Sequence, residues 1–382
     1  MGNKQKVMIF QIGSLGDTVI AMPCYREIVR RHPTADLYLL TNFPIAKKAV
    51  PSETLLAPCN LLAGCVEYPM PLRGAANIAR LWKRVRELRI DILYYLAPEK
   101  SLLNVIRHHI FFKICGVGKV RSVPWSRDAR FPRAIVGGVL WESEGSRLLR
   151  NLISGRGPGP PPPEDRSLGL TDAERSAADR LLAESPSISR FVTISVGGKV
   201  PINNWGDDNW ARALAQISSA DPRLGAVFVG SEDERARNEV LAETWIGPRL
   251  NSCGRLTPRE TAALIEQASL FIGHDTGTLH LAAAVGTRAI GIFSARNVPG
   301  KWYTDRNSDR FFYHRPPCFG CELVKVESCP NDLVCMKHHK VEEIVEAALE
   351  ALSIPRANFF KCRRQSHSRP EELLEDSSSR KC

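Results

Sequence analysis

Long apolar runs, the mark of membrane-spanning segments, are missing from this sequence of 382 residues. The longest apolar stretches, such as residues 102–118, are broken by charges (here Arg107 and Lys113), and none reaches the roughly 20 residues that a bilayer crossing requires. Asp17 interrupts the only N-terminal stretch with the apolar character of a signal peptide. We therefore expect a cytoplasmic protein.

The cysteine content does not fit a secreted disulfide framework either. The chain has eleven cysteines, an odd number, in a large sequence for which we expect no export signal. Free thiols or a metal site are the more common use of cysteine in that setting.

Two motifs of other nucleotide enzymes are absent. Neither half contains the glycine-rich G-x-G-x-x-G turn of dinucleotide enzymes, and no Asp-x-Asp motif occurs. The acidic run Glu232-Asp233-Glu234 is better explained as negative charge at a helix start than as a metal site. We expect no cofactor to be required for catalysis.

Charge is unevenly distributed. The net charge is +11, and residues 73–133 hold fourteen Lys and Arg against four Asp and Glu. Two interpretations stand open: a solvated helix face, or a surface that meets phosphorylated sugars or anionic lipid head groups. Nucleic acid is disfavoured because no regularly spaced aromatic residues accompany the charge.

Strand-like runs alternate with helical stretches in both halves of the chain, which is typical of parallel sheets with crossover helices. The strand-like runs are residues 7–12, 37–41, 92–96, 191–198, 225–230, 271–274 and 289–293. The sequence predicts an α/β protein with two Rossmann-like domains facing across a cleft. Pro23 lies inside the first helical stretch, 18–31, and predicts a kink or a late helix start.

The composition also predicts domain boundaries. The first domain covers residues 1–153, and the Gly/Pro-rich segment 154–170 is expected to link it to the second domain, 171–355. A cysteine-rich insertion occupies 316–336, and the polar tail 356–382 is expected to be mostly disordered.

Two turns between a strand-like run and a helix, here called corners, have the same layout and indicate the function. In the first, Gly13 and Gly16 bracket a turn and Asp17 follows directly; in the second, Asp275, Thr276 and Gly277 lie between an apolar run and a small-residue helix. Free N–H groups and the positive end of the helix dipole make such a helix start a site for an anion. The pair indicates an enzyme that closes over a nucleotide-linked substrate.

Motifs near residues 12, 204, 230 and 274, followed by a Cys-x-x-Cys, closely resemble glycosyltransferase family 9, the bacterial heptosyltransferase-like group. The resemblance runs from about residue 7 to 353. It implies a GT-B fold, in which the N-terminal domain binds the acceptor and the C-terminal domain binds a nucleotide-diphosphate sugar. It also implies inversion at the anomeric carbon.

The resemblance assigns roles to particular residues. Asp17 matches the family's general base, with a helix N-cap as the alternative. Thr276 and Gly277 match its diphosphate contacts, and Glu234 matches the ribose contact, with a plain first-turn acid as the alternative. The predicted donor-binding residues are Ser14, Leu15, Gly16, Gly197, Gly198, Lys199, Asn203, Glu234, Asp275, Thr276, Gly277, Thr278 and His280.

Three of these positions carry open questions. Asp275 either caps the helix or accepts hydrogen bonds from sugar hydroxyls, and His280 is interpreted as a packed structural histidine. Asn203 stands where the family usually has a phosphate-binding lysine, two residues before Trp205, and Lys199 is expected to supply the charge instead. This departure leaves the donor open: heptose or a related sugar.

Four cysteines lie within 18 residues, at Cys318, Cys321, Cys329 and Cys335. A structural zinc site and reduced, packed thiols are equally compatible with this spacing, and disulfides come behind both.

The predicted function is that of an inverting, metal-independent glycosyltransferase. It moves a sugar from a nucleotide-diphosphate donor to a lipopolysaccharide or other cell-envelope glycan, in peripheral contact with the anionic inner face of the membrane. Two alternatives remain: a nucleotide-sugar epimerase of similar build, and a non-catalytic module that binds sugar nucleotides or anionic lipids.

Overall fold

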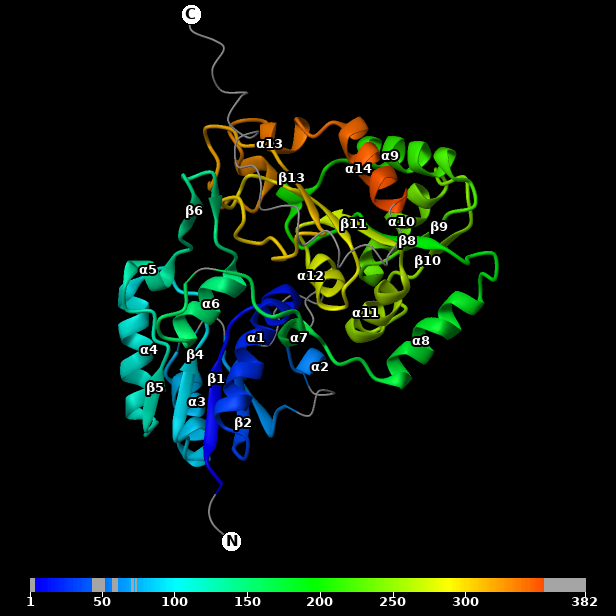
Figure 1. The fold of residues 1–382 in the computed structure, drawn as a ribbon. Coiled ribbons are helices and arrows are strands. Elements are labelled where there is room, and N and C mark those ends of the chain that lie inside the picture. Colours follow the sequence, from blue (N-terminus) through cyan, green and yellow to red (C-terminus); the bar gives the residue numbers. More distant parts are fainter. Residues whose placement is uncertain are drawn as a thin grey trace, which may run out of the picture.

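The computed structural model describes residues 4–42, 52–56, 61–69, 72, 74–157 and 159–353, and the predicted tail lies outside them (Figure 1). Two parallel sheets, each flanked by helices, form the two halves of the molecule, so the prediction of an α/β protein with two Rossmann-like domains is confirmed. No helix within the described ranges is long and apolar enough to cross a membrane.

The first domain is built on a sheet of order β3-β2-β1-β4-β5. Its strands, all parallel, are β1 (Lys6–Phe10), β2 (Asp36–Thr41), β3 (Gly64–Glu67), β4 (Ile92–Tyr95) and β5 (Lys119–Arg121). The helices are α1 (Leu15–Arg31), α2 (Ser52–Leu56), α3 (Ala75–Leu88), α4 (Leu102–Ile114), α5 (Arg127–Arg130) and α6 (Glu144–Leu152). A small antiparallel hairpin, β6 (Ala134–Val136) and β7 (Leu140–Trp141), separates α5 from α6.

The second domain has a sheet of order β10-β9-β8-β11-β12-β13. Its parallel strands are β8 (Phe191–Ser195), β9 (Gly225–Phe228), β10 (Arg249–Asn251), β11 (Leu270–His274), β12 (Ala289–Phe293) and β13 (Arg310–Tyr313). The helices are α8 (Asp172–Ala183), α9 (Asp207–Ala220), α10 (Arg235–Ala242), α11 (Pro258–Gln267), α12 (Gly277–Ala284), α13 (Val334–Lys337) and α14 (Val341–Ser353). Short 3₁₀ turns occur at Pro201–Asn203, Glu232–Glu234 and Val326–Ser328.

Helix α1 begins at the first predicted corner. Ser14 is its N-cap, and a capping box with Asp17 satisfies N–H groups that a helix start leaves free. The helix continues through Pro23, eight residues after its start, so the expected late start is wrong. The capping box explains this: it nucleates the helix upstream of the proline.

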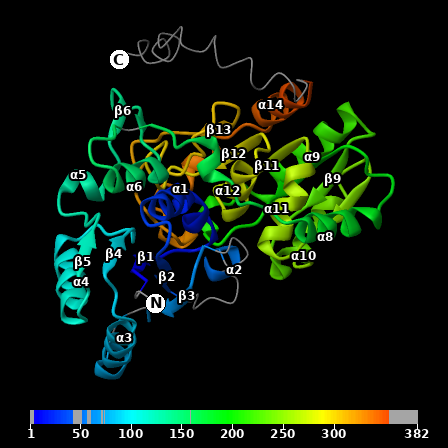
Figure 2. The same ribbon diagram turned by 60° about the horizontal axis from the view of Figure 1, so that its bottom comes forward.

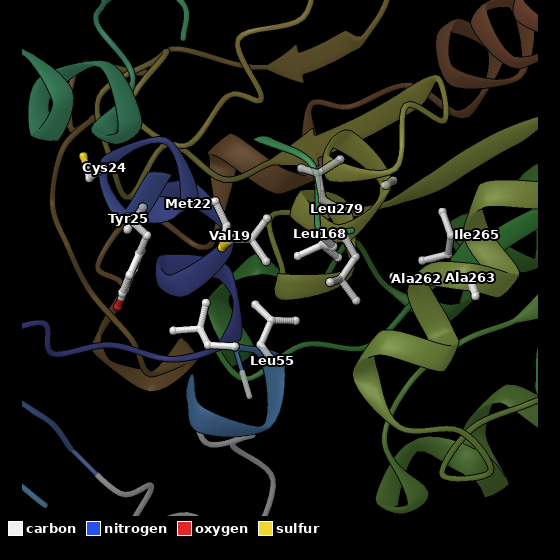
Figure 3. Close-up of a cluster of buried hydrophobic side chains, with 14 of the residues drawn as sticks. Val19, Met22, Cys24, Tyr25, Leu55, Leu168, Ala262, Ala263, Ile265 and Leu279 are labelled. Atoms are coloured by element: carbon white, nitrogen blue, oxygen red, sulfur yellow. The ribbon is translucent and has the colours of Figure 1, made fainter. Parts of the chain in front are cut away.

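A continuous apolar core joins the two domains. It includes Val19 and Met22 of α1, Leu55 of α2, Ile265 of α11 and Leu279 of α12, and Figure 3 labels these side chains. Helices α1 and α12 lie side by side in both ribbon views (Figures 1 and 2). Because both helices start at predicted corners, their packing fixes the two corners relative to each other.

The segment predicted as a linker contacts both domains. Asp165, in the short helix α7 (Pro163–Arg166), accepts from the Arg30 guanidinium at 2.6 and 2.9 Å. The neighbouring Arg166 donates to the carbonyls of Thr304 and Asp305 in the second domain. The domain boundaries themselves stay a prediction.

Candidate active site

Two adjoining cavities lie between the domains, where the strands of both sheets end. The larger cavity has a volume of about 250 Å³ and the smaller one about 180 Å³. They share walls formed by Ser14 and Gly16 of the first domain and by Lys199, Thr276 and Gly277 of the second. Ligands of open α/β sheets bind at this kind of edge.

Every residue predicted for the site lines one of these two cavities. Ser14, Leu15, Gly16, Gly197, Gly198, Lys199, Glu234, Thr276, Gly277 and Thr278 line the larger one. Asp17, Asn203, Asp275 and His280 line the smaller one. The structure therefore brings the predicted residues together, while their roles stay predictions.

Asp17 is held at the rim of the first domain by the start of α1. Its Oδ2 accepts hydrogen bonds from the Ser14 backbone N–H at 2.7 Å and the Ser14 hydroxyl at 3.1 Å. The N-cap residue is Ser14, and Asp17 is the third helical residue of its capping box, so Asp17 does help to cap the helix start although it is not itself the N-cap. Gly13 makes this arrangement feasible, because a Cβ at that position would lie 2.4 Å from Asp17 Cβ.

The carboxyl group of Asp17 is suited to accept a proton. No hydrogen bond to its Oδ1 occurs in the part of the chain that the structure describes, and the side chain faces the smaller cavity. Burial raises the pKa of Asp17, while the hydrogen bonds from Ser14 lower it. A carboxylate of raised pKa is a stronger base than an exposed one.

The start of α12 presents free amides to the same space. Thr276 is the N-cap, and the backbone N–H groups of Thr276, Gly277 and Thr278 donate to no described residue. Gly277 also lets α1 approach, since a Cβ there would lie 2.9 Å from Leu15 Cδ2. A helix start with unpaired amides stabilises negative charge without further reorganisation.

A chain of hydroxyl groups supports this helix start. The Thr276 and Thr278 hydroxyls lie 2.8 Å apart, and Thr278 donates to Ser195 Oγ at 2.9 Å. Ser195 ends β8 and also lines the larger cavity, although sequence reasoning did not single it out. The chain orients the threonine side chains and adds polar groups to the wall.

Glu234 lines the larger cavity, and its carboxylate lies close to two glycines. Its Oε2 accepts from the Ser231 backbone N–H at 2.8 Å, as part of a capping box. Added Cβ atoms at Gly197 and Gly230 would lie 2.0 and 2.5 Å from its carboxylate oxygens. Both strand ends therefore lack side chains where the carboxylate needs room.

Lys199 and Asn203 occupy one loop but differ in their surroundings. Asn203 is buried; its side chain accepts from Ser294 Oγ at 2.6 Å and donates weakly to the Asp275 carbonyl at 3.5 Å. Lys199 is exposed at the boundary of the two cavities, and its charge lowers the pKa of Asp17. Only Lys199 of this pair is placed to offer a positive charge.

Asp275 does not cap α12, because the N-cap is Thr276, so that alternative is wrong. Burial raises the pKa of Asp275 to about 7; Arg296 opposes this shift and the charge of Asp17 adds to it. Two carboxyl groups from opposite domains therefore influence each other across the smaller cavity.

His280 is buried against the first domain, where a Cβ on Gly16 would lie 3.0 Å from its ring. Burial lowers its pKa to about 4, so the ring is neutral near pH 7. This agrees with the interpretation of a packed histidine, although its edge reaches the smaller cavity.

Sequence reasoning missed His274, which organises the loop after β8. Its Nε2 accepts from the Trp205 backbone N–H at 3.2 Å and from Trp210 Nε1 at 3.3 Å. Burial lowers the pKa of His274 to about 3, and a neutral ring is what accepting these bonds requires. In the sequence His274 simply ends an apolar strand and gives no separate signal.

The far end of the larger cavity was also missed. It is lined by Gly254, Leu256, Pro258 and Thr261, which follow the three-residue strand β10 and open α11. The capping box at Thr257 was recognisable, but a three-residue strand shows too little alternation to reveal that the chain returns to the site there.

The four cysteines of the insertion are free thiols. Burial raises the pKa of Cys335, a hydrogen bond with the Ala295 backbone lowers it, and the charges of Cys329, Cys321 and Cys318 raise it further. Among the residues described, no three His, Cys, Asp or Glu side chains are grouped so as to hold a metal ion. The zinc interpretation gains no support from this geometry and stays untested.

The insertion does brace the site. The Arg296 side chain donates to the carbonyls of Leu323 at 2.7 Å and Glu322 at 3.2 Å, and the backbones of 295–296 and 320–322 are hydrogen-bonded. This holds Arg296 at the wall of the smaller cavity.

Comparisons with known proteins agree with this geometry. Residues 159–313 match the family model "Glycosyltransferase family 9 (heptosyltransferase)". No curated protein matches the sequence.

Solved structures share the fold over nearly the whole chain. A family 9 glycosyltransferase from Veillonella parvula superposes with a TM-score of 0.68 at 12% identity, covering 92% of this chain and 98% of that one. The E. coli ADP-heptose LPS heptosyltransferase II superposes with a TM-score of 0.61 at 15% identity, covering 91% of this chain and 98% of that one. E. coli heptosyltransferase WaaC, solved with ADP-2-deoxy-2-fluoro heptose, superposes with a TM-score of 0.56 at 14% identity, covering 90% of this chain and 100% of that one.

The resemblance seen in the motifs is confirmed by the family match, which covers the cavity walls contributed by the second domain. Residues 159–313 thus match glycosyltransferase family 9, and nearly the whole chain has the GT-B-like fold of the glycosyltransferase structures above.

Proposed function

We propose that the protein is an inverting, metal-independent glycosyltransferase that uses a nucleotide-diphosphate sugar as its donor. The single observation that carries this proposal is the pairing across the domain boundary: the Asp17 carboxyl group and the unpaired amides at the start of α12 border the same cavity. One can accept a proton while the other stabilises a departing anion.

The step follows from this arrangement. The acceptor hydroxyl oxygen bonds to the anomeric carbon while the bond from that carbon to the diphosphate oxygen breaks. The hydroxyl proton passes to Asp17, and the electron pair leaves with the nucleotide diphosphate. The amides of Thr276 and Gly277 and the charge of Lys199 balance the growing negative charge. Attack from the side of Asp17, opposite the leaving group, inverts the anomeric centre.

The donor occupies the larger cavity in this proposal. Its ribose diol donates hydrogen bonds to Glu234, and its diphosphate lies at the start of α12. The heptosyltransferases among the structural neighbours, one solved with an ADP-heptose analogue, support heptose or a related sugar. The acceptor is a lipopolysaccharide or other cell-envelope glycan, which the protein meets at the cytoplasmic face of the membrane.

Replacing the base tests the proposal. Asp17→Asn is expected to lower kcat for sugar transfer by about 10²- to 10⁴-fold, because the amide takes up no proton, while donor binding is retained. The measurement is transfer from a nucleotide sugar to an envelope glycan extract.

Glu260→Gln is the matched control, since Glu260 holds the same place in the capping box of α11 but lines neither cavity of the site. If Asp17→Asn keeps full activity, Asp17 is not the general base. Conversion of the donor with no acceptor present would indicate an epimerase. Nucleotide-sugar binding with an unaltered cellular glycan in Asp17→Asn cells would indicate a binding module.

A further inference from the structure

Exposed apolar side chains gather on one part of the first domain. Ten of the fourteen large apolar side chains exposed in the described ranges belong to residues 78–139. They come from α3, from α4, from the surroundings of α5 and from the hairpin β6–β7. We name eight of them the apolar edge: Leu103, Ile106, Ile110, Ile114, Trp125, Phe131, Ile135 and Val139.

Helix α4 supplies the centre of the apolar edge. Leu103, Ile106, Ile110 and Ile114 recur at intervals of three and four residues, so they form one stripe, and Leu103 and Ile114 are 72% and 62% exposed. The opposite side of α4 buries Val105 and Phe112 in the domain core. This helix is therefore apolar on both sides, which a helix facing only water is not.

The other members extend the stripe along one side of the molecule. Figures 1 and 2 both place α4, α5 and β6 along the same edge of the first domain. Trp125 precedes α5, and Ile135 and Val139 lie on the hairpin. Monomeric proteins rarely expose so many large apolar groups together without a partner.

Basic side chains lie beside the apolar edge. Arg107 and Lys113 lie beside the stripe on α4, and Lys119 and Arg121 are exposed on the neighbouring strand β5. Over residues 73–133 the sequence has fourteen basic against four acidic residues. Apolar groups flanked by basic ones, with a tryptophan among them, match the boundary between anionic head groups and acyl chains.

A groove beside α4 adds depth to this surface. It has a volume of about 540 Å³ and is lined by Ile78 of α3 and by Ile110, Phe111 and Ile114 of α4. Polar groups line part of it: Arg107 contributes to its wall, and the Tyr68 hydroxyl lies 3.0 Å from His108 Nε2. An apolar groove with a cation beside it suits an anionic amphiphile.

We propose that the apolar edge docks this protein on an anionic lipid bilayer, with the stripe of α4 inserted between head groups and the basic residues on phosphates. The inference rests on the proposed function in one respect, that the acceptor is membrane-borne. Docking there holds the first domain, which contributes Asp17, at the surface that carries the acceptor. Lipid binding itself needs no sugar transfer.

Vesicle flotation of the full chain tests the docking surface. The protein is expected to float with vesicles of phosphatidylcholine and phosphatidylglycerol, and to bind pure phosphatidylcholine at least tenfold more weakly. Raising the salt concentration is expected to weaken the binding, because screening reduces the charge attraction. The variant Leu103→Glu/Ile110→Glu/Ile114→Glu is expected to lose at least tenfold in affinity.

The control variant is Val240→Glu/Ile246→Glu, which places glutamates at sites 67% and 61% exposed on the second domain. It is expected to bind like the wild type. A second variant, Arg107→Gln/Lys119→Gln/Arg121→Gln, leaves the apolar groups intact and is expected to lose binding chiefly at low salt. Thermal unfolding of each variant shows that it is folded.

Three outcomes would overturn the inference: no flotation of the wild type, equal flotation of the α4 glutamate variant, or a dimer in solution that the same glutamates disperse. The last would assign the apolar edge to a second copy of this chain. Transfer to a detergent-solubilised acceptor is measured alongside. Intact transfer with no flotation overturns only the docking, and flotation with no transfer overturns only the proposed function.

Discussion

Lys199 is the residue that we expect to supply the positive charge missing at position 203, where the family usually has a lysine. Asn203 is buried and bonded to Ser294, so it holds the loop and offers no charge. Lys199 lies at the junction of the two cavities. We expect Lys199→Ala to raise the donor KM or lower turnover at least tenfold, about 1.4 kcal/mol, because a charge-assisted contact to the diphosphate is lost.

Lys325→Ala is the matched control for this substitution, since Lys325 is exposed and lines neither cavity. Steady-state kinetics over a range of donor concentrations separates the effect on KM from that on turnover. Kinetic constants unchanged from the wild type would mean that the loop does not touch the diphosphate.

Asp275 is expected to make the stability of the folded protein depend on pH. Burial raises its pKa to about 7, against roughly 4 in an unfolded chain, so the folded state holds the proton more tightly. Its contribution to stability is therefore full below about pH 4 and is lost as the pH rises through 7. Asp275→Asn removes this titration.

The melting temperature of Asp275→Asn is thus expected to rise relative to the wild type between pH 5 and pH 8. Asp208→Asn, at an exposed position in the first turn of α9, is the control and is expected to show no such trend. A difference between Asp275→Asn and the wild type that stays constant with pH would contradict the assignment.

Which residues could be found from sequence depends on whether they belong to a local pattern. Asp17 and Thr276 follow a strand and open a helix, so spacing alone indicated them. Asp275 was given capping as one of its two interpretations, because sequence cannot decide which of two neighbouring polar residues adopts the extended N-cap conformation. His274 was missed because its partners, Trp205 and Trp210, lie more than 60 residues away.

At the scale of elements, the cysteine-rich insertion acts on the site through the backbone. It holds Arg296 at the wall of the smaller cavity, which Asp275 also lines. Because the proposed transfer step balances the charge of the leaving group with the amides of α12 and uses no metal ion, we expect dialysis against EDTA to leave kcat unchanged.

Metal analysis of the same dialysed sample then bears on the thiols. Zinc that stays bound after dialysis, at one per chain, would mark them as structural ligands, and its removal should lower the melting temperature before it lowers kcat. A loss of turnover that magnesium or manganese restores would contradict metal-independent transfer.

Strands that lie within clear apolar runs were predicted, and the shortest strands were not. Strands β1, β8 and β12 are apolar runs of five residues, long enough to be recognised. Strands β5 and β10 have three residues each and gave no signal. Helix α4 was noted only as an apolar run broken by charges, because sequence does not tell which side of such a helix meets the core.

At the scale of the molecule, one further cavity connects the region between the domains with the groove beside α4. A third cavity of about 470 Å³ lies between the domains and shares Pro98 and Glu99 with the groove beside α4. Its walls hold both basic and acidic side chains, several of them ion-paired: Lys100, Arg127, Arg130, Arg133, Arg147 and Lys301 with Glu99, Asp128, Glu144 and Glu322. Basic side chains therefore exceed acidic ones by only two in this cavity, and both domains contribute to them.

Because both domains wall the larger cavity, in which we propose that the donor binds, ligand binding should stabilise the two domains together. A nucleotide diphosphate at about 100 times its Kd contributes roughly 2.7 kcal/mol, a shift on the order of 5–10 °C for domains of this size. We expect a panel of nucleotide diphosphates and nucleotide sugars to raise the melting temperature of one cooperative transition. Glu234→Ala should reduce the shift for nucleotides and leave that for inorganic pyrophosphate unchanged, because only the ribose contact is lost. Two separate transitions, with the ligand moving one alone, would mean that the first domain does not help to bind the donor and that Ser14, Leu15 and Gly16 merely lie beside it.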